Sequence, residues 1–145
     1  VLNPPAWDWL QNTVLKGRIP VIDHMWQTET SGPVFGNPYG LDMLPIKPGS
    51  AALPLPGIEA AVVRLDGTPC NTGEKGIMVL KRPFPGLTAA LWGEPERYGR
   101  DYWQKIPGVY FSGDSAHVDE DGYFWFAGRA DEIEIGRPVG RAGSG

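Results

Sequence analysis

The stretch GVYFSGDSAHVDEDGYFWFAGR, residues 108–129, decides the fold class. An aromatic and β-branched run leads into the turn formers Asp119-Glu120-Asp121-Gly122, and the aromatic run 123–126 follows directly. Turn residues between two such runs are typical of a β-hairpin. We therefore predict a hairpin over 108–129 and a fold in which strands outweigh helices.

Upstream of this hairpin, the sequence shows two more strands and a short helix. Residues 58–66, IEAAVVRLD, are rich in β-formers and end at Asp66-Gly67, a turn signal. Residues 75–82, KGIMVLKR, form a second apolar β run. Residues 94–104, EPERYGRDYWQ, predict a short helix that carries aromatic side chains.

The N-terminal third predicts one helix and one strand. A helix over 4–16 has Asn3 as its N-cap, prolines in its first turn and a glycine directly after Lys16. Residues 18–26 are apolar enough for a strand, and they run into DHMWQTETSG at 23–32. Residues 32–57 are full of Gly and Pro, and a loop that long in a compact domain is usually functional.

Composition narrows the class of protein further. With 145 residues the chain is long enough for one domain, and 20 Gly and 15 Pro disfavour long helices. The element order indicates an α+β, mostly β fold: a small barrel or sandwich with α/β material at its N-terminal end.

Net charge, hydropathy and cysteine content argue against several classes of partner and site. A net charge of −4 argues against nucleic acid as a partner, and no apolar run is long enough to span a membrane. The single cysteine, Cys70, excludes an internal disulfide and a cysteine-based zinc site. A reducing, cytoplasmic location is therefore the expectation.

Thr28 and Glu29 follow the predicted strand 18–26, where the chain turns out of a sheet. A threonine hydroxyl donates well to a phosphate oxygen, and a carboxylate is a natural Mg²⁺ ligand beside phosphates. The alternative is a polar strand end that caps the next turn. The residues alone leave both interpretations open.

Asp114 and Arg129 are two more candidate site residues. Gly113 allows a sharp turn before Asp114, and one carboxylate accepts hydrogen bonds from both ribose hydroxyls. Arg129 stands between small residues, where its guanidinium is a fork donor for a hydroxyl or a phosphate. The alternatives are a turn aspartate and a surface charge.

Taken in order, these motifs resemble the adenylate-forming enzymes, and among them the AMP-forming acetyl-CoA synthetases. The resemblance covers roughly residues 1–134. It rests on LNPPAW, DHMWQTETSG, GSAALPLPGIEAAVV, GEKGIMVLKRPFPG and YFSGDSAHVDEDGYFWFAGRADE.

The resemblance implies a site and a reaction. It assigns ATP or AMP binding to Asp23, His24, Met25, Trp26, Gln27, Thr28, Asp114 and Arg129. Thr28 and Glu29 would be catalytic, with Glu29 holding Mg²⁺, and Trp26 would close the acyl pocket around a short acid. Asp131 would be a hinge. The implied substrates are ATP, acetate or a similar short carboxylate, and coenzyme A.

The resemblance also implies a domain plan. Residues 1–33 would end an α/β subdomain with the Thr/Glu nucleotide motif, 34–135 would form a distorted β-barrel subdomain ending at the hinge, and 136–145 would be a disordered tail. The family's phosphate loop and lysine-bearing C-terminal domain have no counterpart in this sequence. We therefore predict that the isolated chain is a fragment that does not complete adenylation.

Two other functions compete with an acetate ligase. One is an adenylating ligase for another acid, propionate or an aryl acid. The other is a non-catalytic β-rich module that binds a ligand or a protein through aromatic side chains; its candidates are Trp92, Tyr98, Tyr102 and Trp103.

Overall fold

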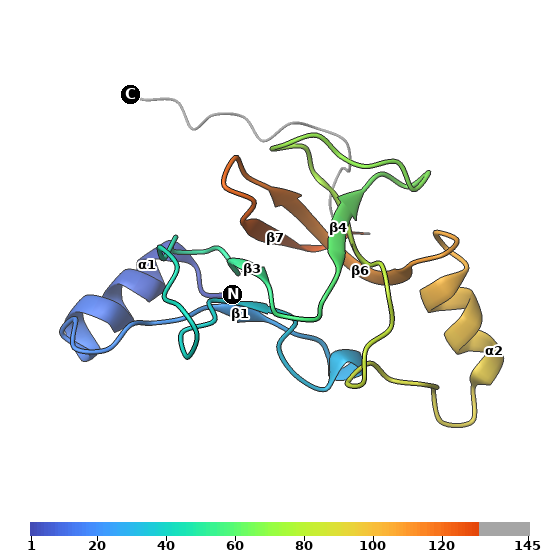
Figure 1. Cartoon of the computed structure of the whole chain (residues 1–145), viewed down its shortest axis with the longest axis horizontal. Coiled ribbons are helices and arrows are strands. Elements are labelled where there is room, and N and C mark those ends of the chain that lie inside the picture. Colours follow the sequence, from blue (N-terminus) through green and yellow to red (C-terminus); the bar gives the residue numbers. More distant parts are fainter. Residues whose placement is uncertain (131–145) are drawn as a thin grey trace.

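The computed structural model describes residues 1–130 and contains two short helical segments and two antiparallel sheets (Figure 1). The helical segments lie at opposite ends of the long axis of the molecule, with the sheets between them. Among the described residues more lie in strands than in α-helix, which confirms the expectation of a mostly β chain. The elements in chain order are α1 (Pro4–Asp8), η1 (Trp9–Val14), β1 (His24–Met25), η2 (Thr28–Thr30), β2 (Phe35–Gly36), β3 (Leu53–Pro54), β4 (Ala60–Val63), β5 (Gly76–Leu80), α2 (Pro95–Tyr98), η3 (Gly99–Trp103), β6 (Tyr110–Val118) and β7 (Phe124–Arg129).

The first helix starts as the sequence predicts and then widens. Asn3 Oδ1 accepts a hydrogen bond from the Ala6 amide at 2.9 Å, which confirms Asn3 as the N-cap. The α-helical turn α1 continues as the π-helix η1, where the Leu15 amide donates to the Leu10 carbonyl at 2.9 Å. The helical stretch therefore ends two residues before the predicted boundary at Lys16.

The predicted strand over 18–26 is wrong except at its last residues, 24–25. Gln11, on η1, is the reason. Its side-chain amide donates to the Ile19 carbonyl at 3.0 Å, and its carbonyl oxygen accepts from the Val21 amide at 2.7 Å. The backbone groups that would pair in a sheet are therefore bonded to a helix side chain, and Pro20 has no amide to offer.

The first sheet has strand order β1-β2-β3, and each strand has two residues. His24 pairs with Gly36, and Phe35 pairs with Pro54 on its other side. Two of these strands lie inside the segment 32–57, which the sequence predicted to be one loop.

The second sheet has strand order β4-β5-β6-β7 and is antiparallel throughout. The predicted hairpin is confirmed: Val118 pairs with Phe124, and the Gly122 amide donates to the Asp119 carbonyl at 3.0 Å. The sheet is open, with β4 and β7 at its edges, so the two sheets form no closed barrel within residues 1–130.

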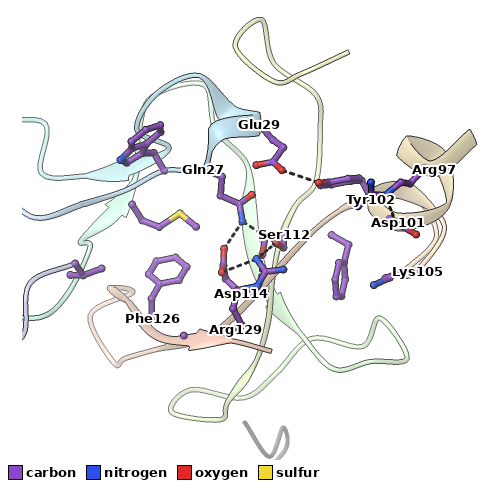
Figure 2. Close-up of a pocket in the computed structure, with 15 residues that line it drawn as sticks. Gln27, Glu29, Arg97, Asp101, Tyr102, Lys105, Ser112, Asp114, Phe126 and Arg129 are labelled. Atoms are coloured by element: carbon purple, nitrogen blue, oxygen red, sulfur yellow. Dashed lines mark hydrogen bonds and ion pairs between the residues drawn. The ribbon is translucent and has the colours of Figure 1, made fainter. Parts of the chain in front are cut away.

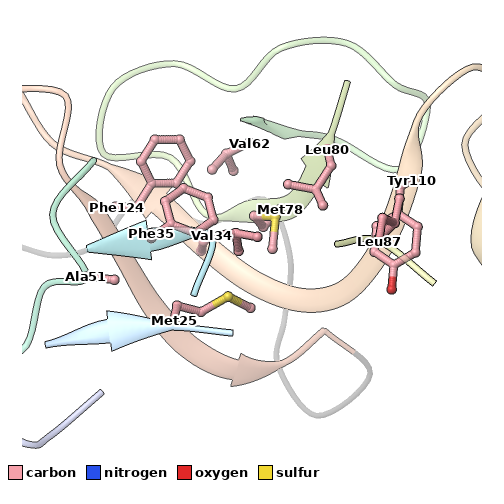
Figure 3. Close-up of a cluster of buried hydrophobic side chains, with 11 residues drawn as sticks. Met25, Val34, Phe35, Ala51, Val62, Met78, Leu80, Leu87, Tyr110 and Phe124 are labelled. Atoms are coloured by element: carbon pink, nitrogen blue, oxygen red, sulfur yellow. The ribbon is translucent and has the colours of Figure 1, made fainter. Parts of the chain in front are cut away.

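The central strand β5 explains where the core lies. All five of its residues are buried, and alternate side chains enter different clusters. Met78 and Leu80 belong to the larger cluster, drawn in Figure 3, whereas Ile77 and Val79 belong to a smaller cluster on the opposite face. Burial on both faces accounts for an apolar run without polar alternation.

Phe35 joins the two sheets. It lies on β2, is fully buried, and its ring centroid lies 4.6 Å from that of Phe124 and 5.3 Å from that of Phe126, both on β7. Figure 3 shows Phe35 and Phe124 side by side in the larger cluster. None of the helices in residues 1–130 is both long and apolar enough to cross a membrane.

Candidate functional site

A cleft of about 640 Å³ opens between the turn at 25–29, the helical segment 95–105 and the strand pair β6–β7 (Figure 2). Polar and charged side chains from all three segments face one another across it. The lining residues are Val1, Met25, Trp26, Gln27, Glu29, Arg97, Asp101, Tyr102, Lys105, Phe111, Ser112, Asp114, Phe126, Gly128 and Arg129.

A bulge in β6 places Asp114 at this cleft. Ile77 pairs with Ser115 and Val79 with Phe111, so three residues of β6, 112–114, stand opposite Met78 alone. Ser112 fills the gap, because its hydroxyl donates to the Met78 carbonyl at 2.6 Å and accepts from the Asp114 amide at 3.1 Å. Bulges of this kind re-aim a side chain away from the ladder.

The Asp114 carboxylate has two partners. Its Oδ2 accepts from Gln27 Nε2 at 2.5 Å, and its Oδ1 lies 3.3 Å from Arg129 Nη1 (Figure 2). Burial raises the pKa of the Asp114 carboxyl, and the charge of Arg129 and the hydrogen bond from Gln27 act in the opposite direction. The side chain is 17 % exposed, so the carboxylate is partly desolvated yet open to the cleft.

Arg129 lies directly on the backbone of Gly113. Its Nη1 donates to the Ser112 carbonyl at 3.2 Å, and a Cβ on Gly113 would lie 2.4 Å from Nη2. Gly113 also has φ +75°, a conformation that other residues adopt with strain. Position 113 therefore requires glycine for two reasons. The bulge needs a positive φ, and any Cβ would clash with the Arg129 guanidinium.

Gln27 joins the turn to the strands. Its Nε2 also donates to the Ser112 carbonyl at 2.9 Å, and its Oε1 accepts from the Tyr110 hydroxyl at 3.3 Å. Its backbone is closed onto Thr30 in a capping box, in which the Gln27 amide donates to the Thr30 hydroxyl oxygen at 2.9 Å. Both ends of the Gln27 side chain are therefore occupied by protein groups.

Glu29 is held at its backbone and at its side chain. The Tyr102 hydroxyl donates to Glu29 Oε1 at 2.8 Å, and the Thr88 amide donates to the Glu29 carbonyl at 2.7 Å. Burial and the hydrogen bond to Glu29 raise the pKa of Tyr102, so the phenol stays protonated as a donor. No group of three or more His, Cys, Asp or Glu side chains in residues 1–130 is arranged to hold a metal ion.

The other predicted site residues lie close to this cleft or outside it. Trp26 is 54 % exposed and lines both the main cleft and an adjoining one of about 480 Å³. Asp23 and His24 line the adjoining cleft only, and Thr28 is exposed but lines neither. Asp131 lies outside the described residues.

Of the two candidate pairs predicted from the residues, Thr28 with Glu29 and Asp114 with Arg129, the structure places all but Thr28 in one cleft. Met25, Trp26 and Gln27 share it with them. The individual roles assigned to these residues stay predictions.

Sequence reasoning missed the contribution of the helical segment to the site. Arg97, Asp101 and Lys105 line the cleft, and Arg97 pairs with Asp101 at 3.3 Å. Tyr102 was noted only as an aromatic of a possible binding module, yet it contacts a residue 73 positions away. The one available signal was the i,i+4 spacing of charged and aromatic residues on a predicted helix.

Comparison with known proteins shows that the sequence of this chain is similar to a segment of acetyl-coenzyme A synthetases. It is 47% identical over 132 residues to the acetyl-coenzyme A synthetase of Chlorobaculum tepidum, and 43% identical over 132 residues to that of Pyrobaculum aerophilum. The enzyme of Rubrobacter xylanophilus is 47% identical over 132 residues. Each match covers 91% of this chain and 20% of the relative, so the chain spans about one fifth of the length of these relatives. No protein-family model matches the chain.

Proposed function

We propose that this chain, which is homologous to a segment of acetyl-coenzyme A synthetases, supplies part of the nucleotide and acid site of an AMP-forming acetate–CoA ligase. In the first step a carboxylate oxygen attacks the α-phosphorus of ATP, which gives an acyl-adenylate and releases pyrophosphate. The coenzyme A thiol then attacks the acyl carbonyl, loses its proton and releases AMP. The observation that carries the proposal is the convergence of Glu29, Asp114 and Arg129 on one cleft.

Asp114 and Arg129 fit the ribose. Each oxygen of the Asp114 carboxylate has one protein partner, and a carboxylate offers about four acceptor positions in all. Two positions therefore stay open for the ribose hydroxyls. Arg129 is 54 % exposed, so its remaining N–H groups face solvent and the nucleotide.

Thr28 and Glu29 are proposed to face the phosphates. Thr28, which is exposed and does not line the cleft, begins the single turn η2 next to Glu29, and in our proposal its hydroxyl donates to an α-phosphate oxygen. Glu29 would hold Mg²⁺, which usually takes one or two carboxylates, substrate phosphates and waters, so a site with a single protein carboxylate suits it. The metal held by Glu29 would offset negative charge on the phosphates, and the Thr28 hydroxyl would help to orient them.

Trp26 fits the end of the acid pocket. It lies at the boundary of the two clefts, because it lines both of them. An indole fills the space that a longer acid needs, so acetate is the proposed acid and propionate the nearest alternative. Asp23, His24 and Met25 border the adjoining cleft and are proposed to contact the nucleotide from that side.

The domain plan is part of the same proposal. Residues 34–135 would be one portion of the distorted barrel, which other segments of the longer enzyme would complete, and Asp131 would be its hinge. Residues 1–33 would close an α/β subdomain, and 136–145 would be a tail. The cytoplasmic location and the use of coenzyme A belong to the proposal as well.

A chimera tests the proposal. We would replace the matching segment of the Chlorobaculum tepidum enzyme with residues 1–130 of this chain and measure acetate-dependent exchange of pyrophosphate into ATP. We expect a folded, active chimera, with activity lost in Asp114→Ala and kept in Asp66→Ala, a matched aspartate on an exposed turn. A folded chimera without activity would contradict the proposal.

The chimera also separates the alternative functions. Trp26→Gly should shift its preference toward longer acids, and an unchanged preference for acetate would remove Trp26 from the acid pocket. A binding module without a nucleotide site would show no response of the isolated chain to AMP.

A further inference from the structure

Three tyrosine rings stand in a row beside the cleft. Tyr98 and Tyr102 lie one helical turn apart on the segment α2–η3, with ring centroids 5.5 Å apart. Tyr110, the first residue of β6, stacks on Tyr102 at a centroid distance of 5.5 Å and an interplanar angle of 25°. Trp103 packs edge-on against Tyr110 at 5.8 Å, so the fully buried end of the row is enclosed by rings.

Two of the three hydroxyls bond directly to residues 27–29, and the third reaches the same stretch through Thr88. The Tyr110 hydroxyl donates to Gln27 Oε1 at 3.3 Å, and the Tyr102 hydroxyl donates to Glu29 Oε1 at 2.8 Å. The Tyr98 hydroxyl donates to the Thr88 carbonyl, and the Thr88 amide in turn donates to the Glu29 carbonyl at 2.7 Å. Figure 2 shows the contact between Tyr102 and Glu29 across the cleft.

The turn that receives these hydroxyls needs external support. The helix η2 has three residues, too few to hold its own conformation, and Glu29 projects from its middle. A tyrosine side chain has only two torsions that move its ring, so packing of the ring also fixes the position of its hydroxyl oxygen. Two such hydroxyls contact the turn directly, and the third holds Thr88, whose amide is bonded to the Glu29 carbonyl.

The Tyr110 hydroxyl also sets the direction of the Gln27 amide. Because a hydroxyl donates to Oε1, the Nε2 group of Gln27 is turned toward Asp114, to which it donates at 2.5 Å. The reverse amide orientation would place a carbonyl oxygen against a carboxylate. The row therefore acts on Asp114 through Gln27 and on Glu29 directly.

We propose that Tyr102 and Tyr110 are positioning residues that fix the Glu29 carboxylate and the Gln27 amide of the cleft, and that Tyr98 supports the Glu29 backbone through Thr88. The geometric part stands on the contacts alone, and its consequence for nucleotide and metal binding rests on the proposed function. Tyr110 governs the ribose side of the site through Asp114. Tyr102 governs the phosphate and metal side through Glu29.

Hydrogen exchange in the 145-residue chain tests the geometric part without any nucleotide. The amides of Gln27 and Thr30 are both bonded within the turn, so their exchange rates report its opening. Tyr102→Phe and Tyr110→Phe remove single hydroxyls and should each raise these rates about tenfold. Tyr123→Phe is the control, since its buried hydroxyl donates to the Pro45 carbonyl at 2.7 Å and does not line the cleft.

The control separates positioning from general stability. Tyr123→Phe should leave the ratio of exchange rates between the turn and the β5 amides unchanged, whereas the two row variants should raise it. Rates at Gln27 and Thr30 that rise no more in the row variants than in the control would overturn the inference.

Nucleotide titrations of the same variants, introduced into the chimera, test the consequence. Tyr110→Phe should weaken AMP binding several-fold without metal, and Tyr102→Phe should weaken only the part of ATP binding that depends on Mg²⁺. If exchange rises in the row variants but no version binds nucleotide, the positioning holds and the proposed function fails. If all versions bind nucleotide with equal affinity, the functional consequence of the row is refuted while the proposed function survives.

Discussion

Two of the three walls of the cleft, the strand wall and the turn wall, are built differently. Asp114 and Arg129 are paired residues of neighbouring strands, so a backbone ladder holds their wall. Gln27 lies just after the two-residue strand β1, Glu29 lies in the three-residue turn η2, and side-chain hydrogen bonds hold their wall. We therefore expect that removing one supporting side chain leaves the strand wall in place, because its backbone ladder remains. Removing one from the turn wall should let the turn open.

The largest effect should come from breaking the link between the two regions. Phe35→Ala removes the ring that packs on Phe124 and Phe126 across the sheets, and truncation of a buried Phe costs about 3–5 kcal/mol. Urea unfolding measures the loss. Phe35→Leu keeps most of the volume and should lose much less. A Phe35→Ala loss below about 1 kcal/mol would show that the regions are held together elsewhere.

The next largest effect should come from the strand wall itself. Gly113→Ala combines a positive φ with a Cβ 2.4 Å from Arg129 Nη2, and we expect it to cost about 2–4 kcal/mol in unfolding free energy. Gly73→Ala is the matched control, because Gly73 has φ +76° and open space around it. It should cost about 1–2 kcal/mol, the strain alone. Equal losses in the two variants would mean that Arg129 moves aside freely.

A smaller effect should come from the side-chain contacts of the N-terminal region. Gln11→Ala removes two hydrogen bonds to the backbone of 19–21 and should cost about 1–2 kcal/mol, with faster exchange of the Val21 amide. Asn12→Ala, which removes only an exposed contact to Asp8, serves as the control. If the Val21 amide exchanges at the same rate in Gln11→Ala, contacts other than those of Gln11 must hold residues 18–22 in place.

The smallest effect should be a pH dependence of the strand wall. Burial raises the folded-state pKa of Asp114 above its ordinary value of 3.8, so the folded chain binds a proton that the unfolded chain has released. Stability should therefore fall as pH rises from 3.8 through the folded pKa, and stay lower above it. Asp114→Asn should remove this slope in urea unfolding measured between pH 3 and 7.

Asp66 should change stability with pH in the opposite direction to Asp114, and it serves as a reference. Hydrogen bonds from Thr68 lower the pKa of Asp66, so its contribution is present above 3.8 and is lost as pH falls through the folded pKa. Asp66→Asn should therefore weaken acid sensitivity at the low end of the range. If the unfolding free energy of Asp114→Asn varies with pH in the same way as that of the wild type, the Asp114 carboxylate is not the cause of the pH dependence.

Local patterns predicted the strand wall well. Aromatic runs flanking Asp119-Glu120-Asp121-Gly122 predicted the hairpin, whereas the sharp turn expected at Gly113 is a bulge within the continuous strand β6. Hairpin pairing depends on neighbours in sequence, so short-range signals suffice. The helix N-cap at Asn3 was predictable for the same reason.

The turn wall was not predictable in the same way. Its supports reach Glu29 and Gln27 from residues more than 70 positions away in the chain, and no spacing rule connects them. Apolar character at 18–22 favoured a strand, but the side chain of Gln11 took the backbone groups that a strand needs. Long-range polar contacts of this kind override local propensity.

The π-helical turn at Trp9–Val14 has a consequence for how this sequence tolerates length changes. A wide turn accommodates one residue more than an α-helical turn would. Deleting a single residue between Trp9 and Gln11 would therefore convert the wide turn to an ordinary α-helical turn, while the helical residues on either side keep their phase. In a regular α-helix the same deletion would rotate the following residues by about 100°, so we expect this helix to tolerate the loss of one residue better than a regular helix of the same length.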